Sequence, residues 1–216
     1  MLILAFDTST PSVGVAVLRD GDVAAVRQQV DARRHGELLA PSIERALADA
    51  GVAIGDLDAI AVGNGPGPFT GLRVGLVTAR SLAHALGIPA YGVCSLDAIA
   101  AAAGDGPLFV ATDARRREVY WATYRDGVRS SGPDVSKPHD IVLRAGDRRA
   151  GHGVQLYAEV LGPVDSELPL FPPPEWIGRL VARALRAGQH PGDVSPLYLR
   201  RPDAQVPSPP KAVLPA

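Results

Sequence analysis

The stretch GNGPGPFTGLRVG, residues 63–75, constrains the fold more than any other part of this chain. It holds five glycines and two prolines and lies between the apolar runs AIAV and LVTARSLAHAL. Proline fixes one backbone torsion, and glycine reaches conformations that are closed to other residues, so the stretch has few shapes available. The pattern predicts a buried strand, a stiff turn and a long helix, in that order.

Glycine-rich turns of this kind can bind phosphate through backbone N–H groups at the start of a helix. Pro66 and Pro68 lack that group, and the lysine followed by serine or threonine of a P-loop is missing. The composition favours a structural turn that orients the helix, with the Thr70 hydroxyl as its N-cap. The residues assigned to this structural loop are Gly63, Gly65, Pro66, Gly67, Pro68 and Thr70.

The helix that follows the turn has one face made of small residues. Spaced four apart along it are Gly71, Gly75, Ala79 and Ala83. Residues at this spacing share a helix face, and a face without large side chains lets a second helix approach closely. That second helix can belong to the same domain or to another protein, and the spacing alone leaves both interpretations open.

The rest of the sequence is typical of an α/β protein with two similar halves. Each half opens with an apolar strand and a hairpin, and the hairpin turns are Asp20-Gly21 and Asp126-Gly127. The second half is shorter and less regular. The predicted division is an N-terminal domain at 1–103, a smaller C-terminal α/β domain at 104–200 and a proline-rich, disordered tail at 201–216.

The bulk composition excludes several classes of protein. The chain has 216 residues and a formal net charge of −1, so no overall basic field would hold nucleic acid unaided. Cys94 is the only cysteine, and the histidines lack metal-ligand spacing, so no metal site is predicted. No run approaches the ~20 apolar residues of a membrane span. The start also lacks a secretion signal, so we expect a cytoplasmic protein.

Asp7 is a candidate for nucleotide chemistry because it ends the first apolar strand. Sugar kinases, actin and Hsp70-type ATPases place a metal–nucleotide or general-base carboxylate there. The second half of such a site is missing, since arginines replace glycines in ATDARRREVY. A turn-capping carboxylate that accepts local N–H bonds is the favoured interpretation.

Arg115, Arg116 and Arg117 are consecutive and lie close in sequence to Tyr120 and Trp121. Arginine and aromatic side chains together can grip RNA. Three charges on a turn are also common on an ordinary solvated surface. The three arginines are therefore candidate RNA contacts, with plain surface as the alternative.

Four segments together resemble the TsaB (YeaZ) family of tRNA threonylcarbamoyladenosine biosynthesis proteins: AFDTST, RHGELLAPSI, GNGPGPFTGLRVGLVTARSLA and DARRREVYWATY. The resemblance covers residues 1 to about 125, and PLYLR at 196–200 resembles the family's C-terminal signature. Pro68 departs from the serine that is usual in the family. The resemblance implies an α/β, two-domain actin-like ATPase fold of the sugar kinase, Hsp70 and actin class, related to TsaD, with a degenerate, shortened second domain.

For function, the resemblance implies a non-catalytic subunit of the bacterial complex that forms N6-threonylcarbamoyladenosine at position 37 of tRNAs reading codons that begin with A. The chain would form a heterodimer with TsaD, which it scaffolds and activates, and the ATPase TsaE would join them. It would bind no cofactor alone, because ATP or ADP and metal belong to the partner subunits. It would meet tRNA through the complex, with Arg115, Arg116 and Arg117 as candidate contacts, and a homodimer is the expectation for the isolated chain.

The resemblance also implies that the small-residue helix and the helix at 37–50 form the interface with TsaD. The interface residues assigned on this basis are Leu39, Ile43, Leu47, Gly71, Leu72, Gly75, Leu76, Ala79 and Ala83. Two alternatives remain: an autonomous ATP-binding enzyme of the actin-like class that uses Asp7, and a peptidase.

Overall fold

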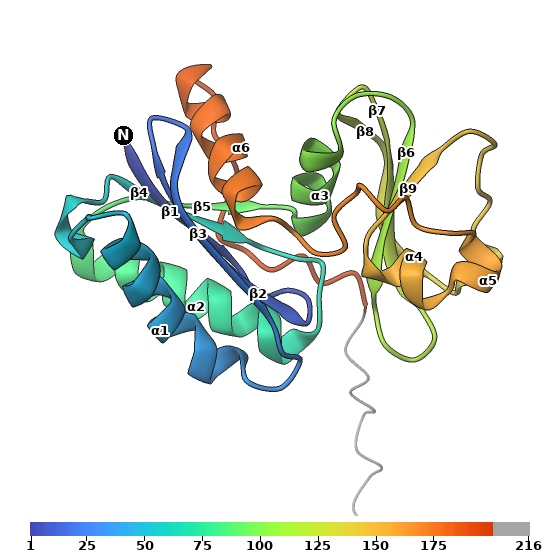
Figure 1. The fold of residues 1–216 in the computed structure, drawn as a ribbon, viewed down its shortest axis with the longest axis horizontal. Coiled ribbons are helices and arrows are strands. Elements are labelled where there is room, and N and C mark those ends of the chain that lie inside the picture. The colour runs from blue at the N-terminus through green and yellow to red at the C-terminus, as the bar shows by residue number, and fades with distance from the viewer. Residues whose placement is uncertain (201–216) are drawn as a thin grey trace, which may run out of the picture.

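Two hairpins, each followed by a parallel crossover, organise the chain into two sheets in the computed structural model, which describes residues 1–200 (Figure 1). The tail at 201–216, for which disorder is predicted, lies outside the described residues. The first sheet has the order β3-β2-β1-β4-β5: β1 (Leu2–Asp7), β2 (Ser12–Arg19), β3 (Asp22–Val30), β4 (Ala59–Gly63) and β5 (Ala90–Val93). The second has the order β8-β7-β6-β9: β6 (Leu108–Asp113), β7 (Val119–Arg125), β8 (Val128–Ser136) and β9 (Arg148–Ala150).

The two sheets repeat one pairing pattern, as the predicted duplication requires. β1 is antiparallel to β2 and parallel to β4, and β6 is antiparallel to β7 and parallel to β9. Both hairpins turn through an aspartate and a glycine with positive φ, 54° and 92° at Asp20 and Gly21, and 49° and 74° at Asp126 and Gly127. Such turns match the right-handed twist of the paired strands. The prediction of an α/β architecture is confirmed.

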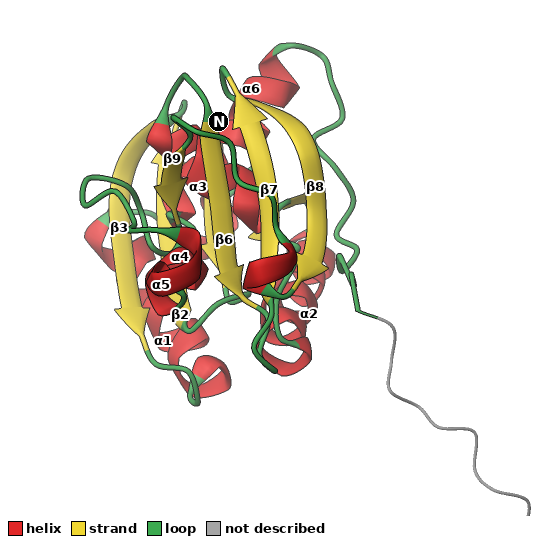
Figure 2. Ribbon diagram, turned by 90° about the vertical axis from the view of Figure 1, so that its right-hand side faces the viewer, coloured by secondary structure: helices red, strands yellow, loops and turns green. Residues whose placement is uncertain are grey.

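Helices cover the sheets in layers. They are α1 (His35–Asp49), α2 (Phe69–Leu86), α3 (Ser95–Ala103), α4 (His152–Leu156), α5 (Ala158–Leu161) and α6 (Pro174–Arg186), with short turns η1 (Ile54–Asp56) and η2 (Pro138–Asp140). In Figure 1, α1 and α2 lie on one face of the first sheet and α6 on the other. Figure 2 shows α4 and α5 in front of the second sheet. α3 lies between the two halves.

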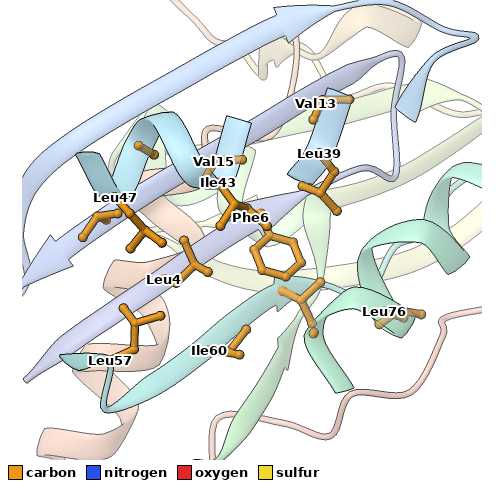
Figure 3. Packing of buried hydrophobic residues seen from close by; sticks show 14 of the residues in the cluster. Leu4, Phe6, Val13, Val15, Leu39, Ile43, Leu47, Leu57, Ile60 and Leu76 are labelled. Atoms are coloured by element: carbon orange, nitrogen blue, oxygen red, sulfur yellow. The ribbon is translucent and has the colours of Figure 1, made fainter. Parts of the chain in front are cut away.

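The core between α1, α2 and the first sheet corrects the predicted interface (Figure 3). Both helices turn their apolar faces inward, toward Leu4, Phe6 and Ile60 of the sheet. The assigned interface residues that this core buries are Leu39, Ile43, Leu47, Leu72, Leu76 and Ala79, none more than 7% exposed. Ala83 is half-buried against the same core. The six buried side chains are covered by their own sheet and offer no surface to a partner in this structure, whereas contact of Ala83 with a partner stays a prediction.

Helix α6 departs from the predicted domain division. Its residues fall within the expected second domain, yet Ile177 and Val181 are buried against the first sheet, beside Ile3 and Leu18. Gly178 makes this contact close, since a Cβ atom added there would lie 2.3 Å from Leu18 Cδ1. The chain therefore completes the second sheet and then returns to cover the open face of the first.

Helix α3 joins the cores of the two halves. Ala98 packs with the first sheet and α6, whereas Leu96 and Ile99 pack with the second sheet. Asp97 on the same helix accepts hydrogen bonds from Tyr124 Oη at 2.7 Å and from Arg129 Nε at 3.0 Å. Both donors belong to the β7–β8 hairpin, so polar and apolar contacts hold α3 to the second half.

The part of the chain that the structure describes contains no candidate for a membrane-spanning helix. None of the helices within residues 1–200 combines the length and the apolar character needed to cross a bilayer.

The thiol of Cys94, just before α3, is expected to be inert. The residue is 7% exposed, and burial raises the pKa of its thiol to about 12, with a further contribution from nearby Asp97. The reactive thiolate forms near pH 8.5 in an unfolded chain. A disulfide reagent at pH 8 should therefore leave the native protein unlabelled and modify one thiol per chain in guanidinium. Rapid labelling of the native protein would contradict this burial.

Candidate functional site

The glycine–proline loop packs against the turn that follows β1. A Cβ atom added at Gly63 would lie 1.7 Å from Asp7 Oδ2, and one added at Gly67 would lie 2.2 Å from the Ser9 carbonyl oxygen. Real Cβ atoms do not approach other atoms so closely. The loop residues Gly63, Gly65, Pro66, Gly67 and Pro68 are thus a structural connection, and glycine occurs where two backbone segments nearly touch.

The small face of α2 meets the same turn. Thr8 Oγ1 donates to the Gly71 carbonyl at 2.7 Å and accepts from the Gly75 amide at 3.0 Å. The hydroxyl therefore bridges a carbonyl and an amide four residues apart, the pair that an uninterrupted helix would join directly. A Cβ atom at either glycine would lie 2.6 Å from Thr8. Gly71 and Gly75, which were assigned to the partner interface, instead face their own chain.

The predicted helix cap is also wrong. α2 begins at Phe69, and its N-cap is Pro68, whose carbonyl accepts the first helical bond from the Leu72 amide at 3.0 Å. Proline at φ −58° already has the torsion that the position needs. Thr70 is an exposed residue of the first turn, and no side-chain cap is present.

Asp7 caps the turn after β1 from a closed position. It is 1% exposed, and its Oδ1 accepts from the Ser9 amide and the Ser9 hydroxyl, both at 2.8 Å. Its Oδ2 accepts from Ser95 Oγ at 2.5 Å. Burial raises the pKa of Asp7, while the hydrogen bonds from Ser95 and Ser9 oppose that rise. A carboxylate so enclosed cannot reach a metal–nucleotide unless these contacts break.

Ser95 is the functional neighbour that sequence reasoning missed. The N-cap of α3 is Cys94, and the Ser95 hydroxyl donates to Asp7. The two residues are 88 positions apart and meet because β1, β4 and β5 are parallel neighbours in the first sheet. Both residues follow the carboxyl end of a predicted strand, which is the signal that could have suggested their contact. The strand order is also needed to show that these strand ends are close in space.

The arginine turn between β6 and β7 is strained. Arg115, Arg116 and Arg117 all have positive φ, 61°, 54° and 61°. This left-handed region costs roughly 1–2 kcal/mol for each residue other than glycine. Asp113 supports the turn by accepting from the Arg115 amide at 2.9 Å, and its other oxygen lies 3.6 Å from Arg115 Nε. The backbone thus presents three exposed arginines at an energetic cost.

Aromatic side chains adjoin the arginine turn. Phe69 at the start of α2 stacks on Tyr198 with ring centroids 5.4 Å apart, and the Arg73 guanidinium lies 3.5 Å from the Phe69 centroid. Arg73 Nε donates to Tyr198 Oη at 3.2 Å. Arg200 forms an ion pair with Glu118, just beyond the turn. The PLYLR segment therefore lies beside both the glycine–proline loop and the arginines.

The side chains of residues 1–200 form no group that could coordinate a metal ion. No three histidine, cysteine, aspartate or glutamate side chains of that range lie close enough together to hold one. The arrangement instead combines a packed structural turn with an open cluster of arginine and aromatic side chains.

Substitution of Gly75 should test the contact between α2 and Thr8. Gly75→Ala places a methyl group against the threonine hydroxyl and should lower the free energy of unfolding by about 1–3 kcal/mol in urea titrations. Gly36→Ala in α1 is the matched control, because nothing lies within 4 Å of the added Cβ. It should raise stability by no more than about 1 kcal/mol. Equal effects of the two changes would refute the close contact.

Substitution of Arg117 should test the strain of the arginine turn. Arg117→Gly removes the penalty of its positive φ and should stabilise the protein by up to about 1 kcal/mol, after the extra backbone entropy of glycine is subtracted. Exposed Arg144 lies outside the positive-φ residues, so Arg144→Gly should destabilise by about 0.4–1 kcal/mol. Thermal unfolding of both variants measures the contrast. A loss of stability in Arg117→Gly would show that the turn is unstrained.

The chain is similar in sequence and in structure to known proteins. A family model described as TsaD, tRNA N6-adenosine threonylcarbamoyltransferase, matches residues 26–159, more than half of the chain. An uncharacterized protein of Mycobacterium tuberculosis is 46% identical over 205 residues, which cover 94% of this chain and 93% of that protein.

Proteins with assigned names are similar as well. The tRNA threonylcarbamoyladenosine biosynthesis protein TsaB of Escherichia coli is 39% identical over 129 residues, 58% of this chain and 55% of that protein. The crystal structure of YeaZ from Pseudomonas aeruginosa superposes with a TM-score of 0.77 at 30% identity, covering 91% of this chain and all of that one. The chain therefore belongs to the TsaD family and is a protein of the TsaB (YeaZ) type.

Proposed function

We propose that this chain is a non-catalytic, cytoplasmic subunit in the formation of N6-threonylcarbamoyladenosine at position 37 of tRNAs that read codons beginning with A. It binds and activates TsaD, and TsaE joins the two. The observation that carries the proposal is the closed environment of Asp7 in a chain of the TsaB type. ATP or ADP and the metal ion then belong to the partner subunits.

The alternative enzymes fit the same residues less well. An autonomous ATP-binding enzyme needs the Asp7 carboxylate open to a metal–nucleotide, and here Ser9 and Ser95 occupy its oxygens. A peptidase needs a nucleophile or a zinc ion, and Cys94 is buried with a raised pKa. These observations favour a subunit role over either enzyme.

The outward faces of α1 and α2 are the surface that we assign to TsaD. The two helices lie side by side on the outside of the first sheet (Figure 1). Exposed residues spaced four apart on α1 are Gly36, Ala40, Glu44 and Ala48. On α2, Val77 is 59% exposed and shares its face with exposed Ser81 and Ala85. Mostly small side chains on both helices would let the helices of a partner approach closely.

This assignment keeps the helices that the family resemblance implies and changes the residues. The buried faces hold the domain together, so only the opposite faces remain for a partner. The same surface would pair two copies when the chain is isolated, which accounts for the expected homodimer. It also places Val77, an exposed aliphatic side chain, near the middle of the contact.

Introduction of a charge at Val77 tests the proposed surface. Val77→Glu would bury an unpaired carboxylate against TsaD and should weaken binding by about 3 kcal/mol, about a hundredfold in Kd. Val128→Glu is the matched control, because Val128 is 70% exposed and lies on the second sheet. Calorimetry with TsaD and formation of the modified nucleoside with TsaD and TsaE measure the effect.

Binding and modification should fall together in Val77→Glu and stay at the wild-type level in Val128→Glu. Circular dichroism controls for folding, which an exposed position should not disturb. Wild-type binding by Val77→Glu would exclude this surface. Full modification by TsaD and TsaE without the chain would exclude the subunit role itself.

A further inference from the structure

A cleft separates the start of α2 from the arginine turn and the last described residues. Its volume is about 610 Å³, within the ~300–1,000 Å³ that ligand sites occupy. Phe69 and Arg73 form one side, Arg115 and Tyr120 another, and Tyr198 and Arg200 complete it. Three segments that are far apart in the sequence therefore line one cleft.

Exposed rings give the cleft a stacking surface. Phe69 is 53% exposed and Tyr198 45%, although both are large aromatic side chains. Their rings stack at an interplanar angle of 25°. Neither ring serves a core cluster of the described residues. The Arg73 guanidinium already lies over the Phe69 ring, so a further planar group, such as a nucleobase, would stack on the exposed ring of Tyr198.

The charge of the cleft differs from that of the whole protein. Four arginines and no carboxylates occur among the described residues that line it: Arg73, Arg115, Arg116 and Arg200. Asp113 and Glu118 pair with Arg115 and Arg200 from outside the lining. Arginines therefore exceed carboxylates in a protein whose net charge is −1. The potential in the cleft suits a phosphate-bearing ligand.

The backbone strain of the arginine turn also favours a binding site in this cleft. Three consecutive residues in the left-handed region are retained where glycine would relieve the cost. Such strain clusters at binding sites. Here the turn places Arg115 in the lining of the cleft that Phe69 and Tyr198 also line. Stacking surface and charge thus meet in one place.

We propose that this cleft binds a single-stranded segment of RNA, with a base stacked on Tyr198 beside Phe69 and phosphates held by Arg73, Arg115 and Arg200. The inference rests on the proposed function in one respect, that the RNA is tRNA. A base and a phosphate would also come with a free nucleotide. The several arginines and the open volume favour a chain with more than one phosphate.

Fluorescence anisotropy of the full chain with a labelled anticodon stem-loop tests the proposal, using the stem-loop of a tRNA that reads a codon beginning with A. Tyr198→Ala should weaken binding about tenfold, and Tyr198→Phe, which keeps the ring, should bind nearly as the wild type does. Arg115→Ala should reduce the slope of log K against log salt by about 0.7, the loss of one single-strand phosphate contact. Arg144→Ala is its control on an exposed loop away from the cleft and should leave the slope unchanged.

Three outcomes would overturn the proposal. One is absence of RNA binding at low salt, or equal binding by Tyr198→Ala and the wild type. A second is that AMP competes as strongly as the stem-loop, which would make the cleft a free-nucleotide site. A third is that Tyr198→Ala abolishes capture of TsaE while RNA binding is unchanged, which would make it a protein-docking site. None of them depends on TsaD, so failure here is distinct from failure of the Val77 surface.

Discussion

The hydroxyl group of Thr8 connects the two segments on which the first domain depends. It bridges the Gly71 carbonyl and the Gly75 amide, so the turn after β1 is held against the first half of α2. Because both glycines lack a side chain, the backbones approach closely enough for this bridge to form. The position of α2 then fixes its inward leucines on the sheet and leaves the opposite face to solvent. The buried core and the proposed partner surface are two sides of the same helix, set by one small contact.

The same packing encloses the carboxylate of Asp7 at the end of the first strand. The strand that ends at Asp7 and the loop that begins at Gly63 are both in place. The loop, however, packs onto the turn, and Ser9 and Ser95 satisfy the carboxylate. The outer helices and the cleft are the surfaces that we propose for other molecules.

The sequence was sufficient for the two hairpins and for the strand, turn and helix around residues 63–75, and insufficient for the contacts between elements. Aspartate followed by glycine predicted both hairpins, because that pair adopts the required left-handed torsions. The four-residue spacing located the small face of α2. Small residues are needed whether a helix or a turn packs closely on that face, so the contact with Thr8 could not be predicted. The cap at Thr70 failed because Pro68 competes for the position with a preset torsion. The bond between Ser95 and Asp7 required the strand order, which joins residues 88 positions apart. The cleft needed the path of the chain after α6, for which no periodic pattern exists.

Helix α3 contributes residues to the cores of both halves, and this affects how the chain can bind a partner. A hinge between the two halves would have to separate Leu96 and Ile99 from the second sheet, or Ala98 from the first. It would also strain the bonds of Asp97 to Tyr124 and Arg129. These contacts oppose a hinge motion between the two halves. A partner that contacts both meets a preorganised shape, and little conformational entropy is lost when the complex forms.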